Sequence, residues 1–227
     1  MKLTAISITL ACCAMLMGPA GAWGGILMTE GAIQVLDPPP PDARQGQLES
    51  SEVIFAWEEQ DDLVLSSDLA VNIVDPGTYN ENGDLVDGVV SAGTRVKVYF
   101  LHADKVTGEG VALIQDARIL FSGLVLGIIT KARDLGPSDF LGEPATQYGD
   151  STARGLELGT GSLKDRITLE GNLQWLDLDQ VRASSIRDEI RVITTFEDGP
   201  IIPEPASLAV LVLGATGVLV RRRRRSV

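Results

Sequence analysis

The chain has almost none of the residues on which nucleophilic and redox chemistry depend. Its 227 residues include two cysteines and one histidine. Cys12 and Cys13 lie side by side near the N-terminus, so the rest of the chain can form no disulfide. Any Ser-His-Asp triad must use His102, and neither a Gly-x-Ser-x-Gly motif nor a Gly-rich phosphate loop is present. We expect no catalytic residue and no cofactor, and we expect His102 to form hydrogen bonds at a strand end or on the surface.

Long helical periods are also missing. Between residues 23 and 205 no stretch keeps an apolar helical period beyond about three turns, and residues 134–140 could form one short turn. The clearest pattern is the alternation in residues 94–102, which places Val96, Val98 and Phe100 on one face and Arg95, Lys97 and Tyr99 on the other. This alternation predicts a half-buried strand.

Other segments rich in strand-forming residues are separated by Gly, Pro, Asn and Asp. We expect further strands at residues 52–58, 63–65, 69–74, 110–121, 125–130, 166–169, 173–178 and 188–196. Many short strands with turns between them predict an all-β fold, a two-sheet antiparallel β-sandwich of jelly-roll or immunoglobulin-like type.

Basic residues are scarce between the two ends of the chain. Six of the 19 basic residues, Lys2 and Arg221 to Arg225, lie outside residues 23–205, whereas all 31 acidic residues lie inside. The remaining 13 basic residues leave this stretch a formal charge of −18. Such a surface is a poor partner for nucleic acid, and its spread charge is typical of a solvated sandwich surface.

The N-terminal residues have the three parts of a secretory signal. Lys2 supplies the charge, an apolar run extends to Met17, and Ala20-Gly21-Ala22 is a small-x-small cleavage site. We expect signal peptidase to cut after Ala22, so that the exported chain begins at Trp23.

The C-terminal residues also form a three-part segment. Pro203-Glu204-Pro205 precedes the apolar stretch 206–220, and Arg221, Arg222, Arg223, Arg224 and Arg225 follow it. As a transmembrane helix the 15-residue stretch would rise only ~22 Å against ~30 Å of hydrocarbon. The arginines act as a membrane stop and hold their end in the cytoplasm, which places everything before Pro203 on the other side of the membrane.

This tail resembles the PEP-CTERM sorting signal of Gram-negative bacteria that make exopolysaccharide. The resemblance implies that Pro203, Glu204 and Pro205 are recognised by exosortase, a membrane-embedded cysteine protease, which cuts near them. It implies a precursor tethered to the inner membrane and a product at the cell surface or outside the cell. A non-catalytic surface or matrix protein associated with exopolysaccharide in a biofilm fits this resemblance.

Five phrases, in order, resemble an ectodomain type often attached to such tails: residues 75–79, 92–102, 119–127, 138–148 and 188–194. This resemblance covers most of residues 50–196 and implies domain boundaries, but no activity. We expect a signal peptide at 1–22, a Pro-rich linker at 23–48, a β-sandwich ectodomain at 49–198 and the sorting tail at 199–227.

Two other interpretations stay open. One is an extracellular carbohydrate-binding module or glycoside-active enzyme, which would use paired carboxylates and an exposed aromatic, Trp57 or Trp175; Trp175 lies in an apolar alternation typical of a core. The carboxylates available are Glu58, Glu59, Asp61, Asp62, Glu157 and Glu170. The other is an irregular Ca²⁺ loop, with weak candidate ligands Asn80, Asn82, Asp84 and Asp87. These residues lack the EF-hand spacing, and Asn82-Gly83 predicts a tight turn instead.

Overall fold

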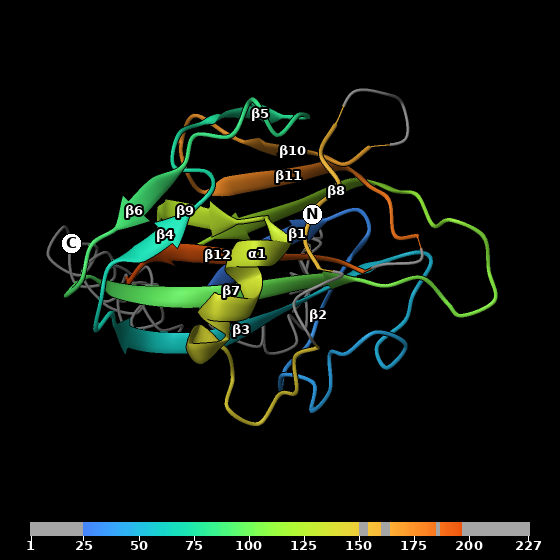
Figure 1. Ribbon diagram of the computed structural model, residues 1–227, viewed down its shortest axis with the longest axis horizontal. Helices are drawn as coiled ribbons and strands as arrows, with labels where there is room; N and C mark the ends of the chain where they lie inside the picture. Colours follow the sequence, from blue (N-terminus) through green and yellow to red (C-terminus); the bar gives the residue numbers. More distant parts are fainter. Residues whose placement is uncertain (1–24, 150–153, 160–163, 185–186, 197–227) are drawn as a thin grey trace, which may run out of the picture.

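Two five-stranded sheets stack face to face in the computed structural model, which describes residues 25–149, 154–159, 164–184 and 187–196 (Figure 1). The predicted signal peptide and sorting tail, with Ala20, Ala22, Pro203 to Pro205 and Arg221 to Arg225, lie outside the described residues. The first sheet has the order β1 (Ile26–Glu30), β8 (Ile114–Phe121), β11 (Trp175–Val181), β10 (Arg166–Leu169) and β5 (Gly77–Tyr79). The second has the order β2 (Ile33–Val35), β3 (Ile54–Val64), β7 (Arg95–Ala103), β12 (Asp188–Thr195) and β9 (Val125–Ile129).

Neighbouring strands run antiparallel except β2 and β3, which are parallel. A small hairpin-like pair, β4 (Leu69–Val71) and β6 (Gly88–Val90), lies beside β9. The chain is therefore mostly β and consistent with the expected β-sandwich. One short helical segment, α1 (Ala132–Leu135) followed by the 3₁₀ helix η1 (Gly136–Leu141), forms where the sequence predicts a turn.

The second sheet is buried on both faces. Between the sheets, apolar side chains of β7, β8, β11 and β12 form one core, which includes Tyr99, Leu101, Ile119, Phe121, Leu176, Leu178, Ile190 and Val192. On the opposite face of the second sheet a second core forms under α1, η1 and the β4–β6 pair; it includes Trp57, Val96, Val98, Phe100, Leu135, Leu141 and Ile193.

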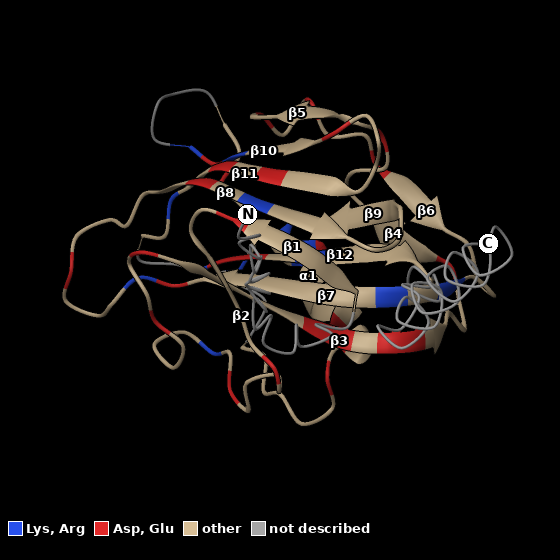
Figure 2. Cartoon of the chain, turned by 180° about the vertical axis from the view of Figure 1, so that it is seen from behind, with Lys and Arg blue, Asp and Glu red and all other residues tan. Residues whose placement is uncertain are grey.

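The predicted half-buried strand at 94–102 is thus wrong in one respect. Val96, Val98 and Phe100 do share a face, but Tyr99 on the other face is also fully buried, because it points into the core between the sheets. Lys97 is nearly buried too and is ion-paired with Asp61. Figure 2 shows this basic start of β7 beside the acidic end of β3.

Two strands lie inside the stretch 23–48 that the sequence suggests is a linker. β1 and β2 have five and three residues, too few for an alternation to stand out. The proline-rich residues after β2 are held against residues 146–147, since Thr146 Oγ1 donates to the Pro40 carbonyl at 2.6 Å and the Ala43 amide donates to the Gln147 carbonyl at 2.9 Å. The sandwich therefore begins at Ile26 and not at residue 49.

Gly31 carries the chain from the first sheet into the second. Its φ is +67°, and a Cβ at this position would lie 1.9 Å from the backbone oxygen of Asp116. We expect Gly31→Ala to lower the free energy of unfolding by about 1–3 kcal/mol, since both the left-handed backbone and the close approach oppose a side chain. Urea unfolding measures this change. Gly83→Ala is the control, because a Cβ there meets no atom within 4 Å; equal unfolding midpoints for the two variants would contradict the expectation.

Candidate functional site

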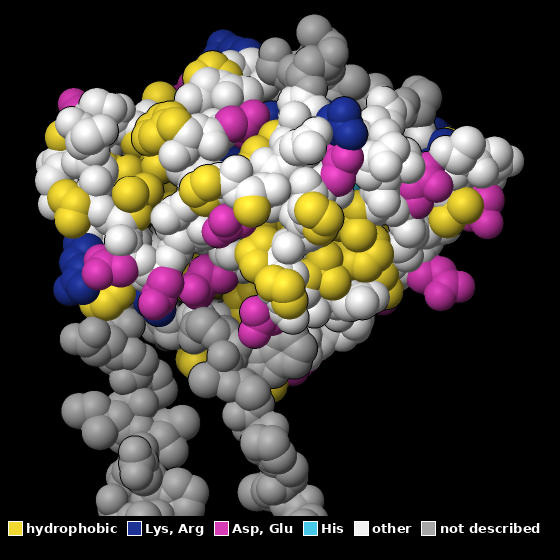
Figure 3. Space-filling view, turned by 90° about the horizontal axis from the view of Figure 1, so that it is seen from below, with side chains coloured by type: hydrophobic (Ala, Val, Ile, Leu, Met, Phe, Trp, Pro, Cys, Tyr) yellow, Lys and Arg dark blue, Asp and Glu magenta, His cyan; other side chains and the backbone are white. Residues whose placement is uncertain are grey.

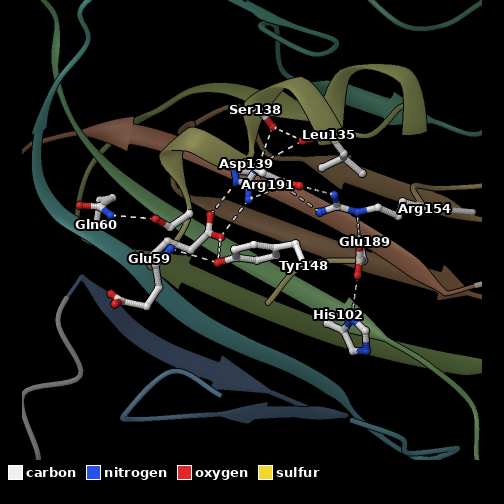
Figure 4. A network of polar contacts seen from close by, with 12 residues as sticks. Glu59, Gln60, His102, Leu135, Ser138, Asp139, Tyr148, Arg154, Glu189 and Arg191 are labelled. Atoms are coloured by element: carbon white, nitrogen blue, oxygen red, sulfur yellow. Dashed lines mark hydrogen bonds and ion pairs between the residues drawn. The ribbon is translucent and has the colours of Figure 1, made fainter. Parts of the chain in front are cut away.

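The second core contains a network of charged side chains rather than apolar residues alone (Figure 4). Its centre is Arg191 of β12, whose guanidinium donates to Glu59 of β3 at 2.6 and 2.9 Å. Both side chains are fully buried. Tyr148 adds a hydrogen bond from its hydroxyl to the Glu59 carboxylate. Arg191 thus ties two strands of one sheet together across β7, which lies between them.

The same arginine holds the helical segment that covers the sheet. Arg191 Nη1 donates to Ser138 Oγ at 2.5 Å, and Nη2 donates to Asp139 Oδ1 at 3.2 Å. Asp139 also accepts two hydrogen bonds from Arg154, at 2.7 and 3.1 Å. Because Ser138 and Asp139 belong to η1, these bonds fasten η1 to the sheet below it.

A second carboxylate, Glu189 of β12, lies next to this pair. Arg154 donates to its Oε2, and Arg187 Nε donates to its Oε1 at 2.7 Å. His102 Nδ1 lies 3.0 Å from the same Oε1, and His102 Nε2 lies 3.2 Å from the carbonyl oxygen of Leu48. The network therefore joins three arginines to three carboxylates, with His102 at its end.

Paired charges shift the pKa values of the network. Burial alone would raise the pKa of Glu189, but His102, Arg154 and Arg187 hold it below its ordinary value. Burial would likewise lower the pKa of Arg191, and the Glu59 carboxylate raises it instead. The pKa of Tyr148 is raised by burial and by the neighbouring Glu59. Both shifts favour the charged forms of Glu189 and Arg191, which are paired as buried charges must be.

His102 is where the sequence prediction fails. The strand end suggested a surface or turn residue, whereas His102 is fully buried because loop residues around Leu48 cover this part of β7. Its ring nitrogens face a carboxylate and a carbonyl oxygen, both of which accept hydrogen bonds. The geometry of His102 is therefore that of a hydrogen-bonding core residue.

The sequence prediction missed Tyr148, Arg154, Glu189 and Arg191. One signal was available in β12, where Glu189 and Arg191 alternate with apolar Ile190 and Val192. This alternation is usually interpreted as a solvent-exposed face. Here the polar face is covered by η1. The residues of β12 themselves give no indication that a six-residue helical segment from another part of the chain will cover them.

An open groove of about 400 Å³ adjoins the network at Glu59. Its lining residues are Ile26, Val35, Leu36, Asp37, Pro39, Glu58, Glu59, Gln60, Asp61 and Glu143. The structure therefore brings together three of the candidate carboxylates, Glu58, Glu59 and Asp61. Burial raises the pKa of Glu58, while the Gly25 amide bonds its carboxylate at 2.7 Å and opposes the rise. Such a groove offers acceptor oxygens to hydroxyl groups or cations.

The other candidate carboxylates have separate partners. Asp62 pairs with Arg95 at 2.7 Å, and Glu170 pairs with Arg118. Glu157 lies 3.7 Å from Lys164. Within the groove, the Glu59 carboxylate already accepts hydrogen bonds from Arg191 and Tyr148.

The two candidate tryptophans lie in environments opposite to those expected, since Trp57 is buried and Trp175 is partly exposed. Trp57 is fully buried in the second core beside Phe100, with ring centroids 5.0 Å apart. Trp175, which the alternation assigned to the core, is only partly buried and lies on the outer face of the first sheet under Arg118, whose Cζ is 4.5 Å from the ring centroid.

The loop at 80–87 sends its oxygen donors in different directions. Asp84 accepts backbone N–H groups of its own loop, at 3.2 Å from Asn80 and 3.0 Å from Glu81. Asp87 pairs with Lys131 at 2.8 Å, and Asn82 donates to the Leu158 carbonyl at 3.3 Å. Among the residues that the structure describes, no group of three or more His, Cys, Asp or Glu side chains is placed to hold a metal ion.

Figure 3 shows one face of the molecule, on which acidic side chains lie around a hydrophobic patch. Within the described ranges no helix is long and apolar enough to cross a bilayer, and the apolar stretch 206–220 lies beyond them.

Comparison with known protein families identifies the tail. Residues 202–225 match the PEP-CTERM protein-sorting motif, a stretch that spans Pro203 to Pro205, the apolar segment and the arginines. No similar curated protein and no similar solved structure was found. The chain is thus a PEP-CTERM protein with a β-rich ectodomain, exported and sorted by way of exosortase.

Proposed function

We propose that the ectodomain is a non-catalytic component of the cell surface or extracellular matrix that associates with exopolysaccharide. In this proposal signal peptidase removes residues 1–22, the precursor is held in the inner membrane by residues 206–220, and exosortase cuts near Pro203 to Pro205. The product then stays at the surface or is released. The sorting motif carries the proposal, since it is the feature that ties this chain to export.

The charge chemistry of the ectodomain supports a structural role. The side chains that could form a polar centre, Glu59, Arg154, Glu189 and Arg191, are fully buried and bonded to one another. The two arginines hold η1 to the sheet through Ser138 and Asp139, so these four side chains are engaged with partners inside the fold. A surface of high negative charge keeps an exported domain soluble.

The groove at Glu58 favours a second candidate, a carbohydrate-binding or glycoside-active ectodomain. It combines an apolar side with several carboxylates, and the raised pKa of Glu58 is the direction that a general acid needs. Against this candidate, Glu59 is occupied by Arg191 and Tyr148, and the aromatic platform expected of a sugar site is missing from the lining residues of the groove.

Co-sedimentation with exopolysaccharide from the native host separates the two candidates. We expect the exported protein to sediment with the polymer and the Glu58→Gln variant to sediment equally well, since the matrix role does not depend on one site. Glutamine keeps an oxygen to accept the Gly25 amide, so the fold is preserved. A loss of binding of about tenfold or more in Glu58→Gln, or sugar release by the parent that this variant lacks, would favour the second candidate.

A further inference from the structure

Four carboxyl groups are buried where β7 ends and β12 begins: Asp104, Asp165, Asp188 and Glu189. Three of the four have partners. Asp104 accepts the Gly46 amide at 2.7 Å, Asp165 accepts the Arg182 amide at 2.8 Å, and Glu189 has the arginines of the network.

Asp188 is different, because neither of its carboxyl oxygens has a hydrogen-bond partner among the residues that the structure describes. It is the first residue of β12, pairs with Ala103 of β7, and is only 3% exposed. A buried carboxyl group without partners is costly when neutral and far more costly when charged.

Most of the side chains packed around Asp188 are apolar, and the space beside it is small. Asp188 lines a cavity of about 10 Å³ together with Ile54, Leu101, Ala103, Leu156, Leu178, Val181, Glu189 and Ile190. A cavity of that size is at the lower limit for one water molecule, and a water needs several polar partners to stay in place. Because Asp188 is only 3% exposed and the space beside it has room for about one water molecule, the fold offers little solvation to a charge on its carboxyl group.

The charged groups that face Asp188 are acidic. They come from four places: Glu189 on its own strand, Asp104 after β7, Glu157 in the segment before β10, and Asp165 at the start of that strand. Three nearby cations have other partners, since Arg154 and Arg187 bond Glu189 and Lys164 lies beside Glu157. Burial first, and then these four carboxylates, raise the pKa of Asp188 well above its ordinary value.

We propose that Asp188 is a proton-controlled latch, which closes this end of the sandwich as a neutral acid and opens it when the proton is lost. The charged carboxylate can be solvated only if β12 and its neighbours part enough to admit water. For an exported protein this links the order of one end of the domain to the pH of its surroundings.

The direction of the pH effect follows from linkage. A carboxyl group with a raised folded-state pKa contributes stability that is complete below its unfolded pKa and is lost as the pH rises through its folded pKa. Asp165, whose pKa burial raises to about 6, acts in the same direction. Stability should therefore begin to fall between about pH 4 and pH 6 and continue to fall above that range as Asp188 ionises.

Infrared spectroscopy and urea unfolding of the exported protein test the latch. In a pH series we expect the parent to keep a carbonyl band of a protonated acid to higher pH than Asp188→Asn does. One group changes the unfolding constant by at most about tenfold per pH unit. We expect Asp188→Asn to abolish the part of this slope above about pH 6 and to unfold at higher urea there. The matched control is Asp104→Asn, a buried carboxyl group with a partner; it should keep both the band and the slope but move them to lower pH, because it removes one of the charges that raise the pKa of Asp188.

Amide hydrogen exchange of the parent protein gives a readout that needs no variant. Exchange at residues 101–103 and 188–190 should accelerate with pH beyond the intrinsic rise, while exchange in β8 should follow the intrinsic rise alone. A protonated-acid band that disappears at the same pH in the parent and in Asp188→Asn, or equal acceleration in both regions, would overturn the proposal. So would an Asp188→Asn variant that folds and keeps the slope of the parent.

Discussion

Replacing Arg191 by leucine is expected to lower the free energy of unfolding by about 3–5 kcal/mol, the cost of leaving a buried charge without its partner. Glu59 would keep only the Tyr148 hydroxyl, and Ser138 and Asp139 would lose their bonds to the sheet. Arg191 also lies over aromatic rings, with its Cζ 5.0 Å from the Phe100 centroid. Urea unfolding of the exported protein measures the change.

Two further variants make this prediction specific. Arg133→Leu, on α1 but with an exposed side chain, should leave the midpoint of unfolding nearly unchanged. The double variant Arg191→Leu with Glu59→Leu should recover part of the loss, because removing both charges of a buried pair leaves nothing unpaired. If Arg191→Leu unfolded at the parent's urea concentration, the network would not be what holds η1 on the sheet.

Neighbouring residues of β12 respond to pH in opposite senses. The pKa of Glu189 is lowered, so its contribution to stability is present above its unfolded pKa and is lost as the pH falls. The pKa of Asp188 is raised, so its contribution is lost as the pH rises. The side chain of Glu189 points into the network and that of Asp188 into the core between the sheets. Because these two neighbouring side chains lie on opposite faces of β12, one of them lowers stability at low pH and the other lowers it at high pH.

The sequence predicts the long strands of this fold better than the short ones, because a long strand carries its own pattern of strand-forming residues. β7 and β12 are long, and their composition predicts them to within about two residues. β1, β2, β5 and β6 have three to five residues each, so their pairing depends on strands far away in the chain. The two-sheet arrangement follows from the long strands, whereas the start of the domain at Ile26 does not.

The charged network could not be predicted for a related reason. Glu59 and Arg191 are 132 residues apart in the chain and meet only because β3 and β12 flank β7. Considered alone, a charged residue such as Glu59 or Arg191 on a strand is expected to face solvent. The cover of η1 turns that face into an interior, and the loop around Leu48 buries His102, which the sequence places at the surface.

Replacing Arg221 to Arg225 by glutamine is expected to release most of the protein uncut. The apolar stretch before them has 15 residues, which as a helix is short by ~8 Å of the hydrocarbon thickness. The arginines resist translocation and hold the chain while a protease in the membrane acts. Without them the tail should pass through the membrane, and intact-mass spectrometry of the culture medium should find the full C-terminus.

A second substitution separates holding from cutting. Glu204→Ala leaves both the apolar stretch and the arginines, so the precursor should stay in the membrane fraction with its C-terminus intact. The parent should have an N-terminus near Trp23 and should have lost its arginine cluster. These opposite outcomes, release without cutting and retention without cutting, follow only if the tail first stops the chain and is then recognised at its Pro-Glu-Pro residues. If both variants were cut and released like the parent, neither the arginines nor Glu204 would be needed for sorting.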